Sequence, residues 1–325
     1  MSTYKVVKYQ PEYKLVWDAF VKHSKNATFL FHRDFMEYHQ DRFEDYSLLV
    51  FKDDNVVALL PAHIKDSVVY SHKGLTYGGL LLSKKSKLLE SFEIFKGLLE
   101  YLNTNGSPRL EIKIIPPFYN QQPSDELEYF MYKAAAELVH RDALMIIDFY
   151  DKLPFQKNRR EGINKAKRHG ISIEIDNNYE GFWNEVLIPN LSKKHNASPV
   201  HTLDEIKLLA SRFPKNIKQI NAYKEGKIVA GTTLFLTETT IHPQYVSGNS
   251  EKNKLGSIDL LYDFMINHFS KGRRCFDFNI SSEEAGKKLN KGLVFWKESC
   301  GARTIVANTY SVNTSVYKTL NLPLV

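Results

Sequence analysis

A histidine and an aspartate in the second half of the chain have the chemistry of an acid–base pair. His242 lies in a predicted strand, residues 240–247, and could serve as a general base, because the unperturbed pKa of a histidine side chain lies near neutrality. Asp277 lies in the alternating stretch 275–280, opposite the aromatic residues, and could orient a base or bind a sugar hydroxyl. The ordinary alternatives are a half-exposed strand histidine and an aspartate that caps a strand end. Pro243 cannot donate to a ladder of hydrogen bonds, which predicts a bulge or a splayed edge beside His242.

A second group of residues could bind phosphate. The stretch 155–169 is predicted to form a helix that has few apolar residues to bury. Four residues at helical spacing form one polar stripe on it: Lys157, Arg160, Asn164 and Arg168. Such a stripe is either a phosphate clamp for a nucleotide-linked or lipid-linked substrate, or simply a solvated face.

The elements that must position these residues occur twice, at an offset of about 167 residues. The first copy predicts a strand, two helices, a hairpin, a third strand, a helix and a strand. Its strands and its last helix fall at 4–9, 46–52, 56–64, 67–72, 86–103 and 110–115. The second copy has strands at 171–175, 240–247 and 275–280, a hairpin turning at 225–227, and helices at 179–194, 202–213 and 257–270. A chain of 325 residues agrees with two domains, which we place at 1–150 and 151–325, with the basic helix 155–169 linking them.

Composition excludes several classes of protein. Hydrophobic residues make up 43% and charged residues 25%, as in ordinary globular proteins, and no apolar run is long enough to span a membrane. The N-terminus lacks the apolar stretch of a signal peptide, so we expect a cytoplasmic protein. Two cysteines, Cys275 and Cys300, give neither a disulfide framework nor a metal-ligand spacing, and no metal is expected. The net charge of +7 favours anionic partners.

The repeated order of three antiparallel strands, helix, strand, helix and strand is that of the GNAT acyltransferases. Two such units in one chain resemble the Fem-type transferases and their acyl-CoA relatives. The resemblance rests on residues 157–170, 76–79 and 276–303, and the last stretch is similar to members found in bacterial surface-polysaccharide and cell-envelope pathways. It implies an α/β (α+β) fold of two tandem GNAT-like units, each with a mixed central sheet flanked by helices.

The resemblance also implies a donor site, with one departure. GNAT enzymes usually open the helix after the fourth strand with glycines whose backbone N–H groups hold the pyrophosphate of coenzyme A. This chain offers one glycine, a capping serine and a lysine, so we expect a reduced anion site at Lys254, Gly256 and Ser257, and we also assign Asn290 to the donor. Fem-type enzymes lack the full motif too, and some take aminoacyl-tRNA, so acyl-CoA and aminoacyl-tRNA both stay open as donors.

Further roles follow from the resemblance residue by residue. Lys297 stands where the family has a lysine near the acyl donor, and its charge could stabilise a tetrahedral oxyanion; otherwise it is a surface charge. Tyr245 could protonate the departing thiolate. His195 and His201 bracket a loop between two predicted helices, where they either line the acceptor pocket or lie on the surface, and both compete with His242 as base. Tyr77 is assigned to substrate binding.

We therefore expect an N-acyltransferase that moves an acyl group, such as acetyl, from acyl-CoA to an amine. The second unit would hold the donor and the degenerate first unit the acceptor side. The acceptor would be a small molecule, such as an amino sugar on a nucleotide or lipid carrier in cell-envelope or surface-polysaccharide synthesis. Two alternatives remain: an aminoacyl-tRNA-dependent peptidyltransferase acting on a peptidoglycan precursor, and a non-catalytic module that binds an anionic envelope precursor or RNA.

Overall fold

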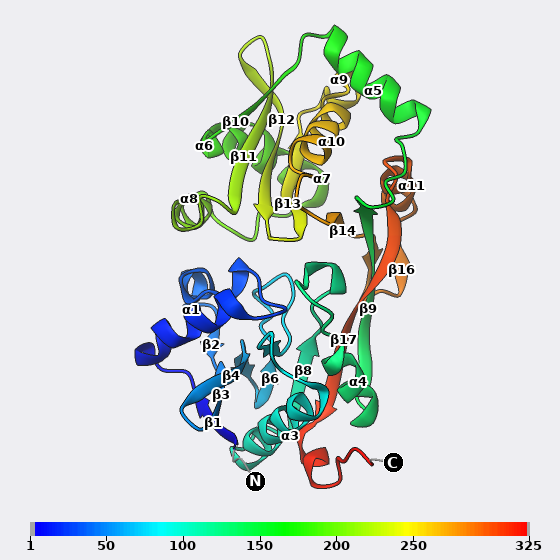
Figure 1. Ribbon diagram of the computed structural model, residues 1–325. Coiled ribbons are helices and arrows are strands. Elements are labelled where there is room, and N and C mark those ends of the chain that lie inside the picture. The colour runs from blue at the N-terminus through cyan, green and yellow to red at the C-terminus, as the bar shows by residue number, and fades with distance from the viewer. Residues whose placement is uncertain (1–3, 324–325) are drawn as a thin grey trace. The chain divides into compact units, whose positions relative to one another are not determined.

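The computed structural model describes residues 4–323 and divides into two compact units, each with its own hydrophobic core (Figure 1). Unit 1 consists of Met1–Asp142, Glu283–Lys288 and Val306–Val325, and unit 2 consists of Ala143–Ser282 and Leu289–Ile305. Within a helix, the side chains of residues 194 and 195 also lie outside the described part.

The described part of unit 1 contains two rows of hydrogen-bonded strands and four α-helices. The first row has the order β1 (Tyr4–Lys8), β3 (Leu48–Lys52), β4 (Asn55–Leu60) and β7 (Leu81–Leu82). The second has the order β17 (Arg303–Asn313), β8 (Arg109–Lys113), β6 (Val68–Tyr70), β5 (His63–Lys65) and β2 (Glu44–Asp45). The helices are α1 (Lys14–His23), α2 (Arg33–Met36), α3 (Leu88–Thr104) and α4 (Glu126–Lys133). Helix α3 buries Phe92, Phe95 and Leu99, which recur at helical spacing, in the core of this unit.

Unit 2 has a sheet with helices on both faces. Its strands follow the order β10 (Ser172–Asp176), β11 (Ile217–Lys224), β12 (Lys227–Leu236), β13 (Thr240–Gly248), β14 (Cys275–Ile280) and β9 (Glu137–Asp148). The α-helices are α5 (Lys157–Arg168), α6 (Tyr179–Gly181), α7 (Ile188–His195), α8 (Leu203–Arg212), α9 (Lys252–Leu255), α10 (Ser257–His268) and α11 (Lys291–Ser299). Residues Leu261 and Met265 of α10 enter the core, as their spacing predicts. On the other face, Phe182 packs so closely on β12 that Gly231 has no room for a side chain.

Neither unit is one continuous stretch of chain, which differs from the predicted division at residue 150. Strand β9 runs through Asp142 in unit 1 and continues from Ala143 in unit 2. Strand β17 begins in unit 2 and returns to unit 1 at Val306, where residues 309–313 pair with β8. In unit 2, β9 pairs with β14 through Cys275↔Asp148 and its neighbours. Each unit therefore includes strand residues from the opposite half of the sequence.

Two predicted elements are divided in the structure. The returning strand of the first hairpin, predicted at 56–64, ends at Leu60 because Pro61 interrupts it, and His63–Lys65 forms the separate strand β5. The predicted helix 179–194 comprises α6, a π-helical stretch at Phe182–Leu187 and α7. Pro189 lies in the first turn of α7, and its missing N–H removes one α-helical hydrogen bond there.

The basic helix α5 packs against α10 (Figure 1). Its buried residues are Gly162, Ile163 and Ala166. A Cβ atom on Gly256, whose φ is +70°, would lie 2.2 Å from the carbonyl oxygen of Gly162. The two glycines therefore allow the backbone of α5 to touch the start of α10.

This backbone contact predicts the outcome of a matched pair of substitutions. Gly256→Ala and Gly272→Ala both force alanine into a left-handed conformation, at φ +70° and +77°. That conformation costs about 1–2 kcal/mol at either position. Only Gly256 has backbone in the way, so Gly256→Ala should cost about 1–3 kcal/mol more in free energy of unfolding. Urea unfolding of both variants measures the difference, and equal destabilisation would contradict the close docking of α5.

Candidate active site

The site begins where two parallel strands separate. Strands β13 and β14 pair only at Thr240↔Cys275 and Ile241↔Phe276. Beyond that point β13 carries a bulge: Pro243 pairs with Leu234 and Tyr245 with Thr233, which leaves Gln244 without a partner residue on β12. The bulge predicted at Pro243 is confirmed. It places His242 at the end of the parallel pairing.

His242 and Asp277 form a buried pair across this separation. The His242 Nδ1 atom lies 3.0 Å from Asp277 Oδ2. Only 3% of His242 and 2% of Asp277 are exposed, while Phe276 and Phe278 lie in the core on the opposite face of β14. A carboxylate only accepts hydrogen bonds, so the neutral imidazole carries its proton on Nδ1 and presents a lone pair at Nε2. That Nε2 is buried and has no hydrogen-bond partner in the described part of the chain.

Lys297 is buried in unit 2 and is not a surface charge. Its side chain comes from α11, and Nζ donates to the backbone oxygens of Asn279, at 3.0 Å, and Ile280, at 2.6 Å. Burial lowers the pKa of Lys297 to about 8, and the charge of Asp277 opposes this only in part.

The two carbonyl groups belong to a turn that ends the regular part of β14. Asn279 has a φ of +65°, and its backbone N–H donates to Asp277 Oδ1 at 2.7 Å. Asn279 therefore departs from the strand alternation that was predicted for residues 275–280. The Asp277 carboxylate thus receives one hydrogen bond from the turn and one from His242.

Tyr245 and His201 form a second pair in unit 2. His201 Nδ1 lies 2.6 Å from the Tyr245 hydroxyl, which also accepts the His201 backbone N–H at 3.1 Å. Burial raises the pKa of Tyr245. The ring of Trp183, from the π-helical stretch, packs edge-on against the ring of Tyr245, with 5.2 Å between the ring centroids. The side chain of His195, the third predicted histidine, lies outside the described residues.

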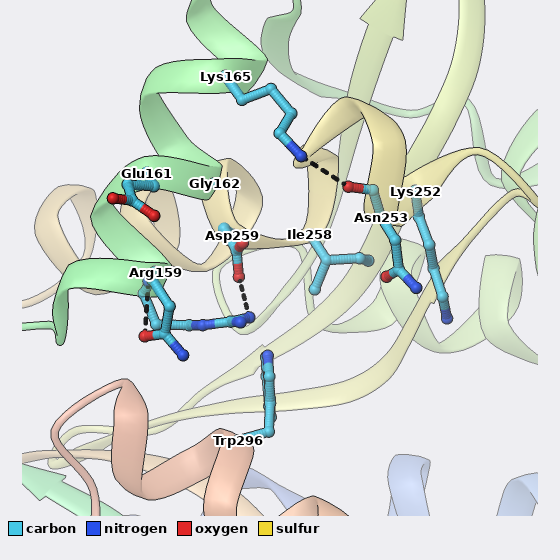
Figure 2. A pocket seen from close by; sticks show the side chains of 10 residues that line it. Arg159, Glu161, Gly162, Lys165, Lys252, Asn253, Ile258, Asp259 and Trp296 are labelled. Carbon is cyan, nitrogen blue, oxygen red and sulfur yellow. Dashed lines mark hydrogen bonds and ion pairs between the residues drawn. The ribbon is translucent and has the colours of Figure 1, made fainter.

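A cavity of about 580 Å³ opens in unit 2 between α5, α9 and the start of α10 (Figure 2). Three cationic side chains line it, Arg159, Lys165 and Lys252, together with the carboxylates of Glu161 and Asp259 and the indole of Trp296. Arg159 Nη1 donates to Asp259 Oδ1 at 2.8 Å, and Arg159 Nε is buried with no partner in the described residues. Lys165 Nζ reaches the carbonyl oxygen of Asn253 at 3.3 Å. The cavity therefore offers three cations, against two carboxylates, and one unused donor to a phosphate group.

The residues predicted to bind the donor lie beside this cavity or are covered. Ser257 is fully buried, and the start of α10 faces the backbone of α5. Lys254 is 74% exposed and pairs with Glu251 at 3.4 Å. Asn290 caps α11, where its side chain accepts from the Leu293 N–H at 3.1 Å.

The residues predicted to bind the substrate divide between surface and core. The whole stripe on α5 is exposed: Lys157, Arg160, Asn164 and Arg168. Arg160 donates to the carbonyl oxygen of Phe155 at 3.1 Å, and Lys157 lies 3.9 Å from Glu161. Tyr77 is 2% exposed in unit 1, where its hydroxyl donates to Thr28 Oγ1 at 2.9 Å.

Unit 1 has a corresponding parallel pair, but its strands do not separate. Strands β6 and β8 pair from Val68↔Arg109 to Tyr70↔Glu111. The chain after β6 then continues the ladder: Ser71 N–H donates to the Glu111 oxygen at 2.9 Å, and Gly78 N–H to the Lys113 oxygen at 3.2 Å. The Ser71 hydroxyl also accepts the Lys113 N–H at 2.8 Å. In unit 1 the chain therefore continues the parallel ladder, whereas β13 and β14 in unit 2 stop pairing after two residues.

Sequence reasoning missed the residues that form the cavity. Arg159, Asp259 and Trp296 were not singled out, because an arginine in a basic helix and an aspartate in the first turn of another helix are ordinary. The available signal was Gly162, since a glycine inside a helix is costly and often marks close packing. A Cβ atom there would lie 1.9 Å from Asp259 Oδ2, which links that glycine to the cavity wall.

Residues 4–323 contain neither a candidate membrane span nor a candidate metal-binding cluster. The helices found there are all too short or too polar to cross a bilayer. The same residues contain no group of three or more histidine, cysteine, aspartate or glutamate side chains placed to hold a metal ion.

Comparisons with known proteins bear on the fold. No family model matches the chain, and no curated protein matches its sequence. Among solved structures, FemX is 10% identical, with 97% of this chain and 99% of FemX covered at a TM-score of 0.66. The L-PGS of Bacillus licheniformis is 13% identical; the match covers 96% of this chain and 94% of that one, at a TM-score of 0.60. The C-terminal domain (DUF2156) of a putative lysylphosphatidylglycerol synthetase from Agrobacterium fabrum is 13% identical; the match covers 81% of this chain and 83% of that one, at a TM-score of 0.56.

At these identities the likeness concerns the fold alone, and it extends over nearly the whole chain. The predicted mixed α/β class, with helices flanking central sheets, is confirmed. The chain therefore has the Fem-like double fold that its repeated element order predicted.

Proposed function

We propose that this protein is an N-acyltransferase whose reaction centre is His242 in unit 2. The observation that carries the proposal is the buried His242–Asp277 pair at the separation of β13 and β14, with Nε2 unpartnered. A buried polar atom without a partner is costly, so its retention calls for an explanation, and a catalytic role is one. A histidine held by a carboxylate and presenting its other nitrogen is suited to remove a proton from an acceptor amine.

The proposed reaction is direct transfer. Nε2 of His242 takes a proton from the acceptor amine as its nitrogen forms a bond to the acyl carbon, and the carbonyl oxygen becomes an oxyanion. Asp277 stabilises the imidazolium that results. Gln244, which has no partner residue on β12, would supply a backbone N–H for the oxyanion. Collapse of the tetrahedral intermediate then breaks the bond to the donor's carrier. Coenzyme A leaves as a thiolate, whereas the ribose oxygen of tRNA takes the proton back from the His242 imidazolium and leaves as a hydroxyl.

The cavity in unit 2 is the proposed site for the carrier of the acyl group. Arg159, Lys165 and Lys252 would bind phosphate, and the Trp296 indole offers a flat apolar surface for a base or a pantetheine chain. The exposed stripe on α5 would bind the phosphates of a nucleotide-linked or lipid-linked acceptor. In unit 1 the corresponding strands do not separate, which supports the assignment of the donor to unit 2.

The carrier has two candidates, of which acyl-CoA is the first. The cavity lies against α9 and the start of α10, where the GNAT resemblance implies that coenzyme A binds. Aminoacyl-tRNA is favoured by a different observation: α5 covers the start of α10, so the backbone cradle for a pyrophosphate is replaced by separate cationic side chains. Separate cations suit the single phosphodiesters of an RNA end as well as a pyrophosphate.

The deciding experiment measures transfer directly. Purified protein is incubated with labelled acetyl-CoA, a longer acyl-CoA or aminoacyl-tRNA, each with a panel of UDP-amino sugars and peptidoglycan precursors. We expect transfer from one donor class and thermal stabilisation by that donor. A donor at 100 times its dissociation constant should stabilise by about 2.7 kcal/mol. Binding of a donor or acceptor without transfer to any amine would favour the non-catalytic alternative.

His242 can be tested through its pH dependence. His242→Ala should lower kcat by about 10²–10⁴, the usual contribution of a general base. The loss should be greatest at low pH, where the acceptor amine is mostly protonated, and should lessen as pH rises. His268→Ala, an exposed histidine on α10, is the control and should leave kcat unchanged. An equal loss at every pH would argue against a base role for His242.

The cavity can be tested independently of the chemistry. Lys165→Met and Lys252→Met should each weaken donor binding about 10- to 100-fold, because a charge-assisted hydrogen bond contributes about 1.5–3 kcal/mol. The control is Lys167→Met, since Lys167 is exposed on the same helix and does not line the cavity. Titration calorimetry measures the dissociation constants. If all three variants bind the donor as the wild type does, the carrier lies elsewhere.

A further inference from the structure

We infer that Lys297 is a positioning residue that holds Asp277, and through it His242, in the reactive arrangement. This inference rests on the proposed function and changes the role expected for this lysine. The resemblance assigned Lys297 to the oxyanion, whereas here its ammonium group is directed at two backbone carbonyls. The groups concerned form a continuous series from α11 to the imidazole.

The first part of the series is the turn at the end of β14. Lys297 Nζ binds the oxygens of Asn279 and Ile280, at 3.0 and 2.6 Å, and only 4% of the lysine is exposed. The first of these carbonyls belongs to Asn279, whose backbone lies in the left-handed region at φ +65°. That conformation is unfavourable for a residue with a side chain, so it persists where its surroundings hold it. A buried ammonium on two successive carbonyls is a strong restraint of this kind.

The second part of the series connects the turn to the base. The Asn279 N–H donates to Asp277 Oδ1 at 2.7 Å, and Asp277 Oδ2 accepts from His242 Nδ1 at 3.0 Å. The turn therefore fixes one carboxylate oxygen and leaves the other to fix the imidazole. If the turn relaxes, the carboxylate can rotate, and His242 loses the contact that keeps its proton on Nδ1. The lone pair at Nε2, which the proposed reaction requires, is then no longer assured.

The decisive measurement is the tautomer of His242, because an oxyanion role would not affect it. Long-range ¹H–¹⁵N spectra of protein with labelled histidine distinguish a proton on Nδ1 from a proton on Nε2. The wild type should show the Nδ1–H form. Lys297→Met should lose this signature and should lower kcat about 10²-fold, as a small misplacement of a reacting group does. Asp277→Asn gives the reference spectrum for a lost carboxylate.

Two variants serve as controls for this measurement. Lys291→Met removes an exposed lysine from the same helix, and it should keep both the tautomer and kcat. Lys297→Gln replaces Lys297→Met if the latter does not fold, as judged by thermal unfolding. A lower kcat with an unchanged tautomer would overturn the inference and return Lys297 to the reacting atoms. Unchanged tautomer and unchanged kcat would also overturn it.

The pH profile of the wild-type enzyme provides a test that needs no substitution. Lys297 is charged below its pKa of about 8 and neutral above it. A neutral amine keeps two N–H groups, enough for both carbonyls, so a positioning role should persist. Turnover should therefore not fall as pH rises through that value. An oxyanion role depends on the charge, so turnover would then fall toward tenfold for each further pH unit. If no acceptor supports turnover, the proposed function fails, but the tautomer measurement still decides the role of Lys297.

Discussion

The separation of β13 from β14 after two paired residues is the constraint on which the rest of unit 2 depends. Parallel strands that separate inside a protein leave backbone groups that must find other partners. Here side chains supply them. Lys297 donates to the carbonyl oxygens of Asn279 and Ile280 in the turn that ends the regular part of β14, and Asp277 accepts the N–H of Asn279 in the same turn. The groups that satisfy the backbone are thus the groups that orient His242. Unit 1 meets the same requirement with Ser71 and Gly78, whose backbone N–H groups extend its ladder.

A second constraint is the contact between α5 and the start of α10. A helix start can bind an anion through its free N–H groups, but only if nothing covers it. Gly162 and Gly256 bring backbone against backbone at that point, and the cations nearby are the side chains Arg159, Lys165 and Lys252. Side-chain cations are longer and more adaptable than a row of backbone amides. The donor site that we propose in unit 2 would therefore depend on Arg159 and Lys165 of α5, a helix that lies outside the repeated order of elements.

The repeated order of elements was readable from the sequence because strands, turns and amphipathic helices carry local signals. The alternation Phe276, Asp277, Phe278 correctly separated core from polar face, and Pro243 correctly marked the bulge. The pairing of His242 with Asp277 joins residues that are far apart in sequence, and no local pattern encodes it. The partners of Lys297 are backbone carbonyls, which leave no trace in residue types. The continuation of the β8 ladder by Ser71 in unit 1 likewise depends on a loop conformation that composition does not specify.

The interlaced composition of the two units has a consequence for how the chain is made. One row of strands in unit 1 is completed by β17 pairing with β8, and β17 is synthesised after residues 143–282 of unit 2. Unit 1 therefore cannot reach its final structure until β17 has left the ribosome, however early its first 142 residues emerge. Until then, the side of β8 that pairs with β17 is an unpaired edge, which is the kind of surface that promotes aggregation. The nascent chain would thus expose an incomplete sheet for longer than a chain of two consecutive domains.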